Sequence, residues 1–204
     1  MNTLLKITAS LAGANGQSAQ LADRFAANWL AQNPHGRVVT RDLSADAIPH
    51  LTAERFQALL AKPDERTAEQ RAVAEYSDTL VEELKGADVI VFAVPMYNFS
   101  VPSTLRAYFD HIARAGVTFR YTAAGAQGLI QGKQTYVFIT RGGYYAEAAD
   151  TQTPYLRQFL GFVGLTDVQF VYAEGLAISD EAREKSLTAA RQAIAKLTPA
   201  ALAA

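Results

Sequence analysis

The chain of 204 residues has no cysteine, only two methionines and a single tryptophan. Without cysteine there is no disulfide framework, no thiolate zinc site, no iron–sulfur cluster and no thiol redox centre. Any redox chemistry would therefore need a bound organic cofactor to carry the electrons. Long apolar runs of roughly 20 residues, as in a membrane-spanning helix, are also missing. Because Lys6 interrupts the apolar start, we expect a cytoplasmic protein without a signal peptide.

Charge of either sign is scarce as well. Charged residues make up 19% of the chain, and the formal net charge is -1, so neither a nucleic-acid nor a membrane partner is indicated. Half of the residues are hydrophobic, which over this length suffices for a full core and excludes a disordered chain. We find no repeat and no linker, and we expect a single domain over residues 1–204.

Apolar segments alternate with helical patterns, which predicts an α/β fold with a doubly wound parallel sheet. The near-continuous apolar run 88–94 is typical of a central strand covered on both faces. Thr67 and Gln70 form a capping-box pattern at the start of a helix that Gly86 ends. The predicted strands are 3–8, 38–43, 88–94, 134–140 and 168–173. The predicted helices are 52–60, 67–86 and 154–162, with others around 21–29, 105–112 and 187–197; the end beyond Pro199 is expected to fray.

In such a sheet, ligands bind beyond the carboxyl ends of the strands. The loop 9–18 after the first predicted strand is small and polar and leads into a helix, whose free N–H groups can bind a phosphate. Ser10, Gln17 and Ser18 add side-chain donors. The loop matches neither the Walker pattern nor the dinucleotide fingerprint. The alternative is that Ser18 only caps the helix and the rest is a turn.

Two further loops at this edge have an unusual composition. Residues 95–102 are bulky and partly apolar between two prolines, which suits a cover over a flat ligand or a plug over the core. Later, Arg141 precedes Gly142 and Gly143, which permit a close approach of the backbone to a ligand. Alternatively, the glycines only make a turn, and Arg141 pairs with an acid such as Asp110.

Other chemistry is not indicated. His35, His50 and His111 form no metal-binding pattern, and we expect solvated or structural roles for them and no metal. Asp110 and Arg114, four residues apart, are expected to support a helix surface. The absence of a Gly-x-Ser-x-Gly elbow argues against a hydrolase.

Together, the loops resemble those of the FMN-dependent NAD(P)H azoreductase and quinone reductase family of flavodoxin-like proteins. The resemblance spans nearly the whole chain and is carried by residues 95–99, 114–121, 141–143 and 159–164. It implies a flavodoxin-like fold, with a five-stranded parallel sheet of order 2-1-3-4-5 and helices on both faces. It also implies tightly bound FMN, NADH or NADPH as the reductant, and a homodimer with active sites at the interface.

The resemblance also assigns residues. On the FMN phosphate it places Ser10, Gly16, Gln17 and Ser18, whereas Ala9 has lost a donor that many relatives carry. Along the isoalloxazine it places Met96, Tyr97, Asn98 and Phe99. At the pyrimidine edge it places Thr140, Arg141, Gly142 and Gly143. The substrate pocket would be walled by Asn98, Phe99, Tyr121 and Phe162, with Tyr121 reaching across the dimer.

In the mechanism that the resemblance implies, NAD(P)H delivers a hydride to the flavin and leaves. A quinone or an aromatic azo compound then takes its place, so the kinetics are ping-pong and no general acid is essential. Two alternatives stay open: a one-electron carrier of the flavodoxin type, and a non-enzymatic interaction module. NADH and NADPH are not distinguished, because Arg55, Lys62 and Arg66 could meet a 2′-phosphate or be solvated.

Overall fold

The computed structural model describes residues 2–145 and 149–197, so the expected fraying beyond Pro199 lies outside the described residues. Five parallel strands form the main sheet in the order β2-β1-β3-β6-β7. Numbered along the chain within this sheet, the order is 2-1-3-4-5, and the predicted fold class is confirmed. The strands are β1 (Thr3–Thr8), β2 (Arg37–Asp42), β3 (Val89–Pro95), β6 (Gln134–Thr140) and β7 (Asp167–Ala173).

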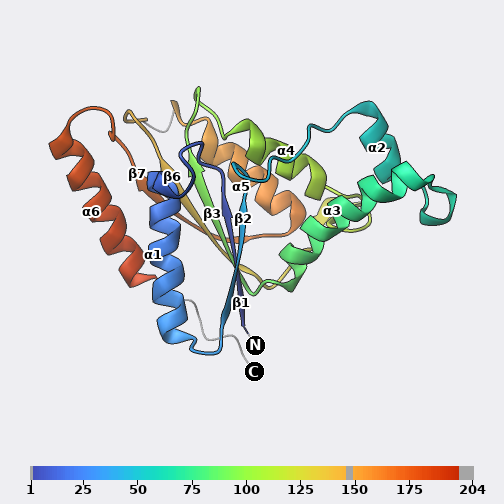
Figure 1. The fold of residues 1–204 in the computed structure, drawn as a ribbon, viewed down its shortest axis with the longest axis horizontal. Helices are drawn as coiled ribbons and strands as arrows, with labels where there is room; N and C mark the ends of the chain where they lie inside the picture. The colour runs from blue at the N-terminus through green and yellow to red at the C-terminus, as the bar shows by residue number, and fades with distance from the viewer. Residues whose placement is uncertain (1, 146–148, 198–204) are drawn as a thin grey trace.

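Helices cover both faces of this sheet (Figure 1). On one face lie α1 (Gln17–Gln32) and α6 (Asp180–Lys196). On the other lie α3 (Ala68–Gly86), α4 (Ser103–Ile112) and α5 (Gln152–Val163), and α2 (Ala53–Leu60) packs against α3. Two short 3-10 turns, η1 (Gly13–Asn15) and η2 (Pro63–Glu65), lie in the connections. The predicted capping box of Thr67 and Gln70 is present at the start of α3.

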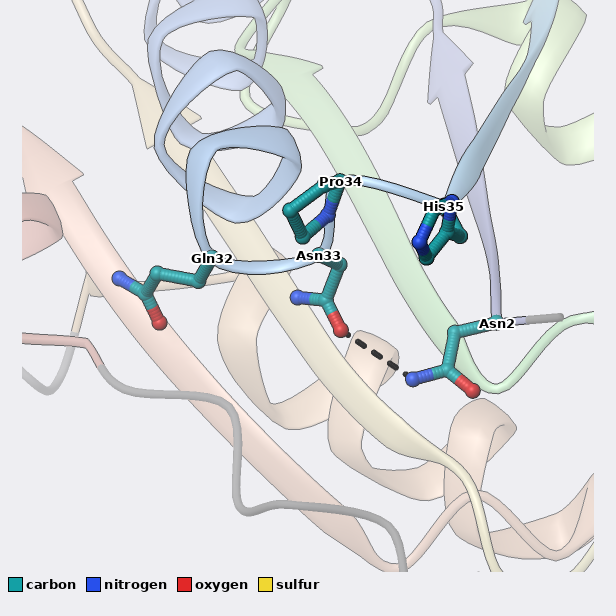
Figure 2. Close-up of a pocket in the computed structure, with 6 residues that line it drawn as sticks. Asn2, Gln32, Asn33, Pro34 and His35 are labelled. Carbon is teal, nitrogen blue, oxygen red and sulfur yellow. Dashed lines mark hydrogen bonds between the residues drawn. The ribbon is translucent and has the colours of Figure 1, made fainter.

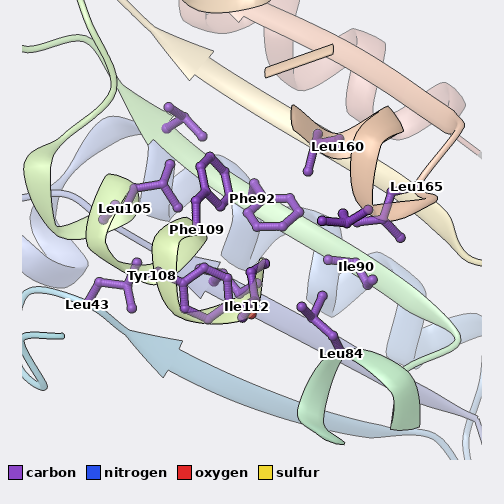
Figure 3. Packing of buried hydrophobic residues seen from close by; sticks show 14 of the residues in the cluster. Leu43, Leu84, Ile90, Phe92, Leu105, Tyr108, Phe109, Ile112, Leu160 and Leu165 are labelled. Atoms are coloured by element: carbon purple, nitrogen blue, oxygen red, sulfur yellow. The ribbon is translucent and has the colours of Figure 1, made fainter. Parts of the chain in front are cut away.

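The core consists of two apolar clusters, one on each face of the sheet. All seven residues of β3 are buried, because this strand is central and covered on both sides. On the face of α3, α4 and α5, Phe92 of β3 meets Phe109 of α4 edge to face, with 5.9 Å between ring centroids (Figure 3). Burial of these rings stabilises the sheet that carries the loops.

Parallel pairing brings the carboxyl ends of the strands to one edge. Thr8 of β1 lies opposite Ala93 of β3, Pro95 opposite Thr140 of β6, and Thr140 opposite Ala173 of β7. The loops that follow these strands therefore lie side by side, as the sequence predicts.

A small antiparallel hairpin was not predicted. It consists of β4 (Phe119–Thr122) and β5 (Gly125–Gly128). A Cβ on Gly128 would overlap the backbone of Gly164, which ends α5 with a positive φ of 107°. The hairpin therefore packs directly against α5, and only glycine allows this approach.

The expected support of Asp110 by Arg114 is wrong. Asp110 pairs with Arg106, at 3.3 Å, whereas Arg114 turns inward to Asp78, at 2.9 Å. The reason is that α4 ends at Ile112, so Arg114 no longer continues the helical surface.

Phe92→Ala is expected to lower the free energy of unfolding by about 3–5 kcal/mol, because it leaves a cavity under the central strand. Urea denaturation measures this change. The control is Phe56→Ala on α2, where the side chain is 47% exposed and the expected change is within about 0.5 kcal/mol. Equal losses in the two variants would contradict the position of Phe92 in the core.

Candidate functional site

A crevice of about 290 Å³ opens at the carboxyl ends of β1, β3 and β6. This is the edge at which ligands bind in open parallel sheets. Of the residues predicted for the cofactor, the lining includes Ser10, Gly16, Gln17, Met96, Tyr97, Thr140, Arg141 and Gly142. It also includes Ala12, Asn15, Pro95, Leu176 and Arg183, which were not predicted. Leu176 and Arg183 follow β7, and the same rule about strand ends would have pointed to them.

The first loop leaves the start of α1 open. The helix begins at Gln17 with no side-chain cap and no acidic residue in its first turn. A Cβ on Gly16 would overlap the Ser10 side chain, so the turn needs glycine to bring Ser10 against the helix start. Helix N–H groups without a competing acid favour an anion at this point.

Ser18 does not cap α1, contrary to the alternative raised from the sequence. The cap position is Gly16, and Ser18 is already inside the first turn. Its hydroxyl is buried and has no hydrogen-bond partner among the described residues, and Ser18 itself does not line the crevice. A buried hydroxyl without a partner is costly, and an anion at the helix start would supply one.

The loop after β3 contains a tight, strained turn. Tyr97 and Ser100 exchange two backbone hydrogen bonds, of 3.1 and 3.0 Å, around Asn98 and Phe99. Asn98 and Phe99 have positive φ angles of 49° and 63°, which is unusual for a bulky residue such as Phe99. The Tyr97 hydroxyl accepts a hydrogen bond from the Leu11 N–H at 3.1 Å and so ties this loop to the first.

Asn98 and Phe99 do not themselves line the crevice, and the Phe99 side chain is 65% exposed. An exposed aromatic ring on a strained turn beside a crevice is typical of a functional position.

The loop after β6 offers backbone donors. The carbonyls of Gly142 and Gly143 accept hydrogen bonds from Ala177 and Gly175, both at 2.9 Å. Their N–H groups donate to no acceptor among the described residues. The Gly142 donor at the crevice suits an electron-rich ligand edge, and Gly143 lies next to it, outside the lining.

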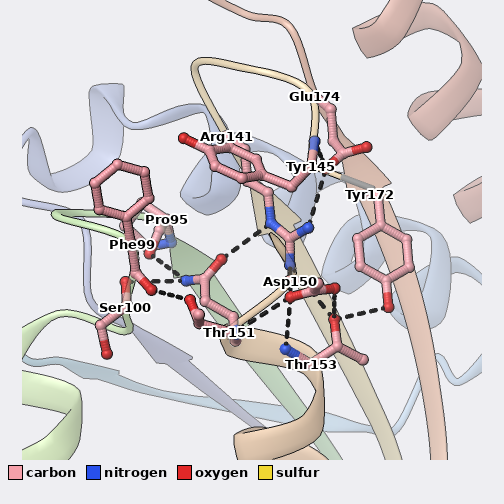
Figure 4. A network of polar contacts seen from close by, with 11 residues as sticks. Pro95, Phe99, Ser100, Arg141, Tyr145, Asp150, Thr151, Thr153, Tyr172 and Glu174 are labelled. Carbon is pink, nitrogen blue, oxygen red and sulfur yellow. Dashed lines mark hydrogen bonds and ion pairs between the residues drawn. The ribbon is translucent and has the colours of Figure 1, made fainter. Parts of the chain in front are cut away.

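The Arg141 side chain turns away from the ligand space into a polar network (Figure 4). It is 2% exposed and donates to Asp150 at 2.6 Å, to Glu174 at 3.0 Å and to Gln152 at 3.1 Å. The partner acids are therefore Asp150 and Glu174, not Asp110 as the sequence suggested. A buried guanidinium with these partners is held by the protein itself, so only the backbone of Arg141 is free to serve a ligand.

The same network sets the charge of Asp150. Burial alone would raise the pKa of this carboxyl group, but hydrogen bonds from Thr153 and Arg141 outweigh it and hold the pKa below its ordinary value. Asp150 therefore stays ionised beside Arg141 down to acidic pH.

The other two residues predicted for the substrate pocket lie elsewhere in the single chain. Tyr121, on β4, is 76% exposed, and Phe162, on α5, packs on Phe119 with 4.2 Å between ring centroids. Neither lines the crevice. One copy of the chain thus presents an exposed aromatic hairpin and an open crevice separately.

A second hollow of about 290 Å³ lies at the opposite end of the sheet (Figure 2). It is lined by Asn2, Gln32, Asn33, Pro34, His35 and Gly36, and Asn2 donates to Asn33 at 3.1 Å. This is the amino end of the strands, where parallel sheets do not place their ligands. The crevice, not this hollow, is the candidate site.

Two further properties concern residues 2–145 and 149–197. In these residues, no helix is long and apolar enough to cross a bilayer. No group of three or more histidine, aspartate or glutamate residues within them could hold a metal ion.

Comparisons with known proteins match almost the whole chain. Residues 1–198 match the model of a family described by its flavodoxin-like fold. An FMN-dependent NADH:quinone oxidoreductase from Cellvibrio japonicus is 56% identical over 177 residues, covering 86% of this chain and 89% of the relative.

Two solved structures are similar as well. An azoreductase from Bacillus anthracis has a TM-score of 0.88 at 28% identity, covering 96% of this chain and 98% of that chain. An FMN-dependent NADH-azoreductase from the same species, in complex with FMN, has a TM-score of 0.85 at 26% identity, covering 96% and 99% of the two chains.

Asp150→Asn is expected to lower the free energy of unfolding by about 2 kcal/mol at neutral pH, because Arg141 loses a charged partner. Since the folded-state pKa is lowered, the stabilisation is complete above the ordinary value of 3.8 and is lost as the pH falls through the folded value. The difference between the variant and the original protein should therefore shrink towards about pH 3, as followed by urea denaturation.

The control is Asp64→Asn in η2, an exposed carboxylate for which little change is expected at either pH. A cost of Asp150→Asn that is the same at both pH values would contradict the role of the carboxylate charge.

Proposed function

Because the chain belongs to the flavodoxin-like family, in the group that includes FMN-dependent NADH:quinone oxidoreductases and azoreductases, we propose that it binds FMN in the crevice and reduces quinones and aromatic azo compounds. This membership confirms the resemblance found in the sequence. The observation that carries the proposal is the convergence of three loops on one crevice, with an open helix start at one end and free backbone donors at the other.

The phosphate end of the crevice fits FMN. Ser10, Gly16, Gln17 and Ser18 hold the phosphate at the start of α1, where no acid competes for the N–H groups. The unpartnered buried hydroxyl of Ser18 supports this assignment. Arg183, which lines the same crevice, adds positive charge on the approach to it.

The ring end of the crevice fits as well. Met96 and Tyr97, which line the crevice, provide a partly apolar surface, and Asn98 and Phe99 continue it on the adjoining turn. Thr140, Arg141, Gly142 and Gly143 face the pyrimidine edge, and the two glycines do so with free N–H groups. When bound, FMN supplies a ring that accepts and returns a hydride. The backbone donors stabilise negative charge at the ring edge and need no reorganisation to do so.

The reductant and the acceptor bind one after the other at the same position over the flavin ring, so the kinetics are ping-pong. The lining contains no acid and no histidine, and protons come from water. NADH is the proposed reductant. The names of the NADH-dependent relatives agree with this choice.

The functional unit is a homodimer. Tyr121 and Phe99 are both largely exposed in the single chain, and Tyr121 does not reach its own crevice. In the dimer, Tyr121 reaches the crevice of the other copy and forms the acceptor pocket with Asn98, Phe99 and Phe162. Large exposed aromatic side chains beside an open crevice are typical of such an interface.

Steady-state kinetics test the function. With NADH and a quinone or azo acceptor varied together, double-reciprocal plots should give parallel lines, and purified protein should carry FMN. Uptake of FMN without steady-state turnover would instead indicate a one-electron carrier. Failure of the protein to take up added FMN would indicate an interaction module and contradict the proposal.

Ser18→Ala is expected to weaken FMN binding about tenfold, because one hydrogen bond to a charged group is lost. Titration of the apoprotein, followed by quenching of flavin fluorescence, measures the dissociation constant. Riboflavin, which lacks the phosphate, is the matched control ligand, and its affinity should not change. An equal loss for both flavins would show that Ser18 does not contact the phosphate.

A further inference from the structure

Gln152 is a fully buried polar residue at the start of α5, and its side chain has partners on two different loops. Its Oε1 accepts a hydrogen bond from Nε of Arg141 at 3.1 Å. Its Nε2 donates to the carbonyl oxygens of Pro95 at 3.2 Å and Ser100 at 3.1 Å (Figure 4). Both hydrogens of the amide nitrogen therefore take part in hydrogen bonds, and so does the amide oxygen.

These contacts clamp both ends of the turn after β3. Pro95 is the last residue of β3, and Ser100 closes the turn around Asn98 and Phe99. Thr151, the neighbour of Gln152, donates from its hydroxyl to the carbonyl of Phe99. The start of α5 therefore holds three carbonyls of a segment of six residues.

The turn needs such a restraint. A non-glycine residue at positive φ costs about 1–3 kcal/mol and persists only where its surroundings impose it. Asn98 and Phe99 both have this conformation, and the Phe99 ring is largely exposed, so side-chain packing alone does not fix it. Backbone hydrogen bonds from a buried side chain fix it instead.

Only a neutral amide suits this position. A glutamate of the same length would turn a carboxylate oxygen towards the carbonyls of Pro95 and Ser100, acceptor against acceptor. It would also add a third acid around Arg141, which already has Asp150 and Glu174. In the structure, the NH₂ group of Gln152 faces the carbonyls of Pro95 and Ser100, and its amide oxygen faces the guanidinium of Arg141.

We propose that Gln152 is a positioning residue that couples the loop after β6 to the loop after β3 and thereby sets the ring end of the FMN site. This inference rests on the proposed function. Gln152 does not line the crevice and touches no reacting atom; it acts through Pro95, Ser100 and Arg141.

The test compares flavin binding in Gln152→Met, which keeps the shape but loses the hydrogen bonds, and in Gln152→Glu. Because the turn lies at the ring end, both variants should bind FMN and riboflavin more weakly by the same factor, about tenfold. Ser18→Ala, in contrast, should affect FMN alone. The visible circular dichroism of the bound flavin should also change in the Gln152 variants, which a merely structural role would not cause.

The matched control is Gln134→Leu, a glutamine at the start of β6 on the opposite edge of the sheet. It should leave both flavin affinities and the flavin spectrum unchanged. A folded Gln152→Met that binds both flavins with unchanged affinity and spectrum would overturn the inference while leaving the proposed function in place. If the original protein binds neither flavin, both proposals are overturned.

If Gln152→Met does not fold, Thr151→Val tests the inference instead. Thr151 is exposed, so the fold tolerates the substitution. The substitution nevertheless removes the hydrogen bond from the Thr151 hydroxyl to the Phe99 carbonyl. The expected result is a loss of about threefold for FMN and riboflavin alike. Unchanged affinities for both would overturn the inference.

Discussion

Parallel pairing of the strands is the constraint on which the site depends. Because neighbouring strands run in the same direction, each connection must cross back along a face of the sheet, and the next loop always emerges at the same edge. The register fixes this edge closely, with Pro95, Thr140 and Ala173 side by side. Residues separated by more than a hundred positions are thus assembled into one crevice without any direct link in sequence.

The same edge separates two kinds of polar group. Apart from Arg183, ligand-facing positions present backbone N–H groups and hydroxyls, whereas the ionised side chains around Arg141 are paired with one another. Arg141 shows the division within a single residue, since the residue lines the crevice while its guanidinium lies among Asp150, Glu174 and Gln152. Fixed charge thereby supports the loops without occupying the space for the ligand.

Much of this was predictable from the sequence, and the exceptions have physical causes. The strands, their order and the crevice loops followed from apolar periodicity and from the resemblance. The hairpin of residues 119–128 could not be predicted in this way, since its second strand, β5, consists of small residues and glycine and lacks an alternating pattern. The acids around Arg141 could not be foreseen, because they come from other segments and only the fold brings them there. Arg114 was misjudged because it lies beyond the end of α4 at Ile112, where helical spacing no longer brings it beside Asp110.

The buried hydroxyl of Ser18, which has no hydrogen-bond partner in the part of the chain that the structure describes, has a consequence for the protein in the cell. A buried hydroxyl that gains its partner only when a ligand binds makes the free energy of unfolding depend on that ligand. If FMN is that ligand, as proposed above, the supply of flavin would become a determinant of how much folded protein accumulates. Cells short of riboflavin would then hold less of this protein even at constant synthesis, through turnover of the unloaded form.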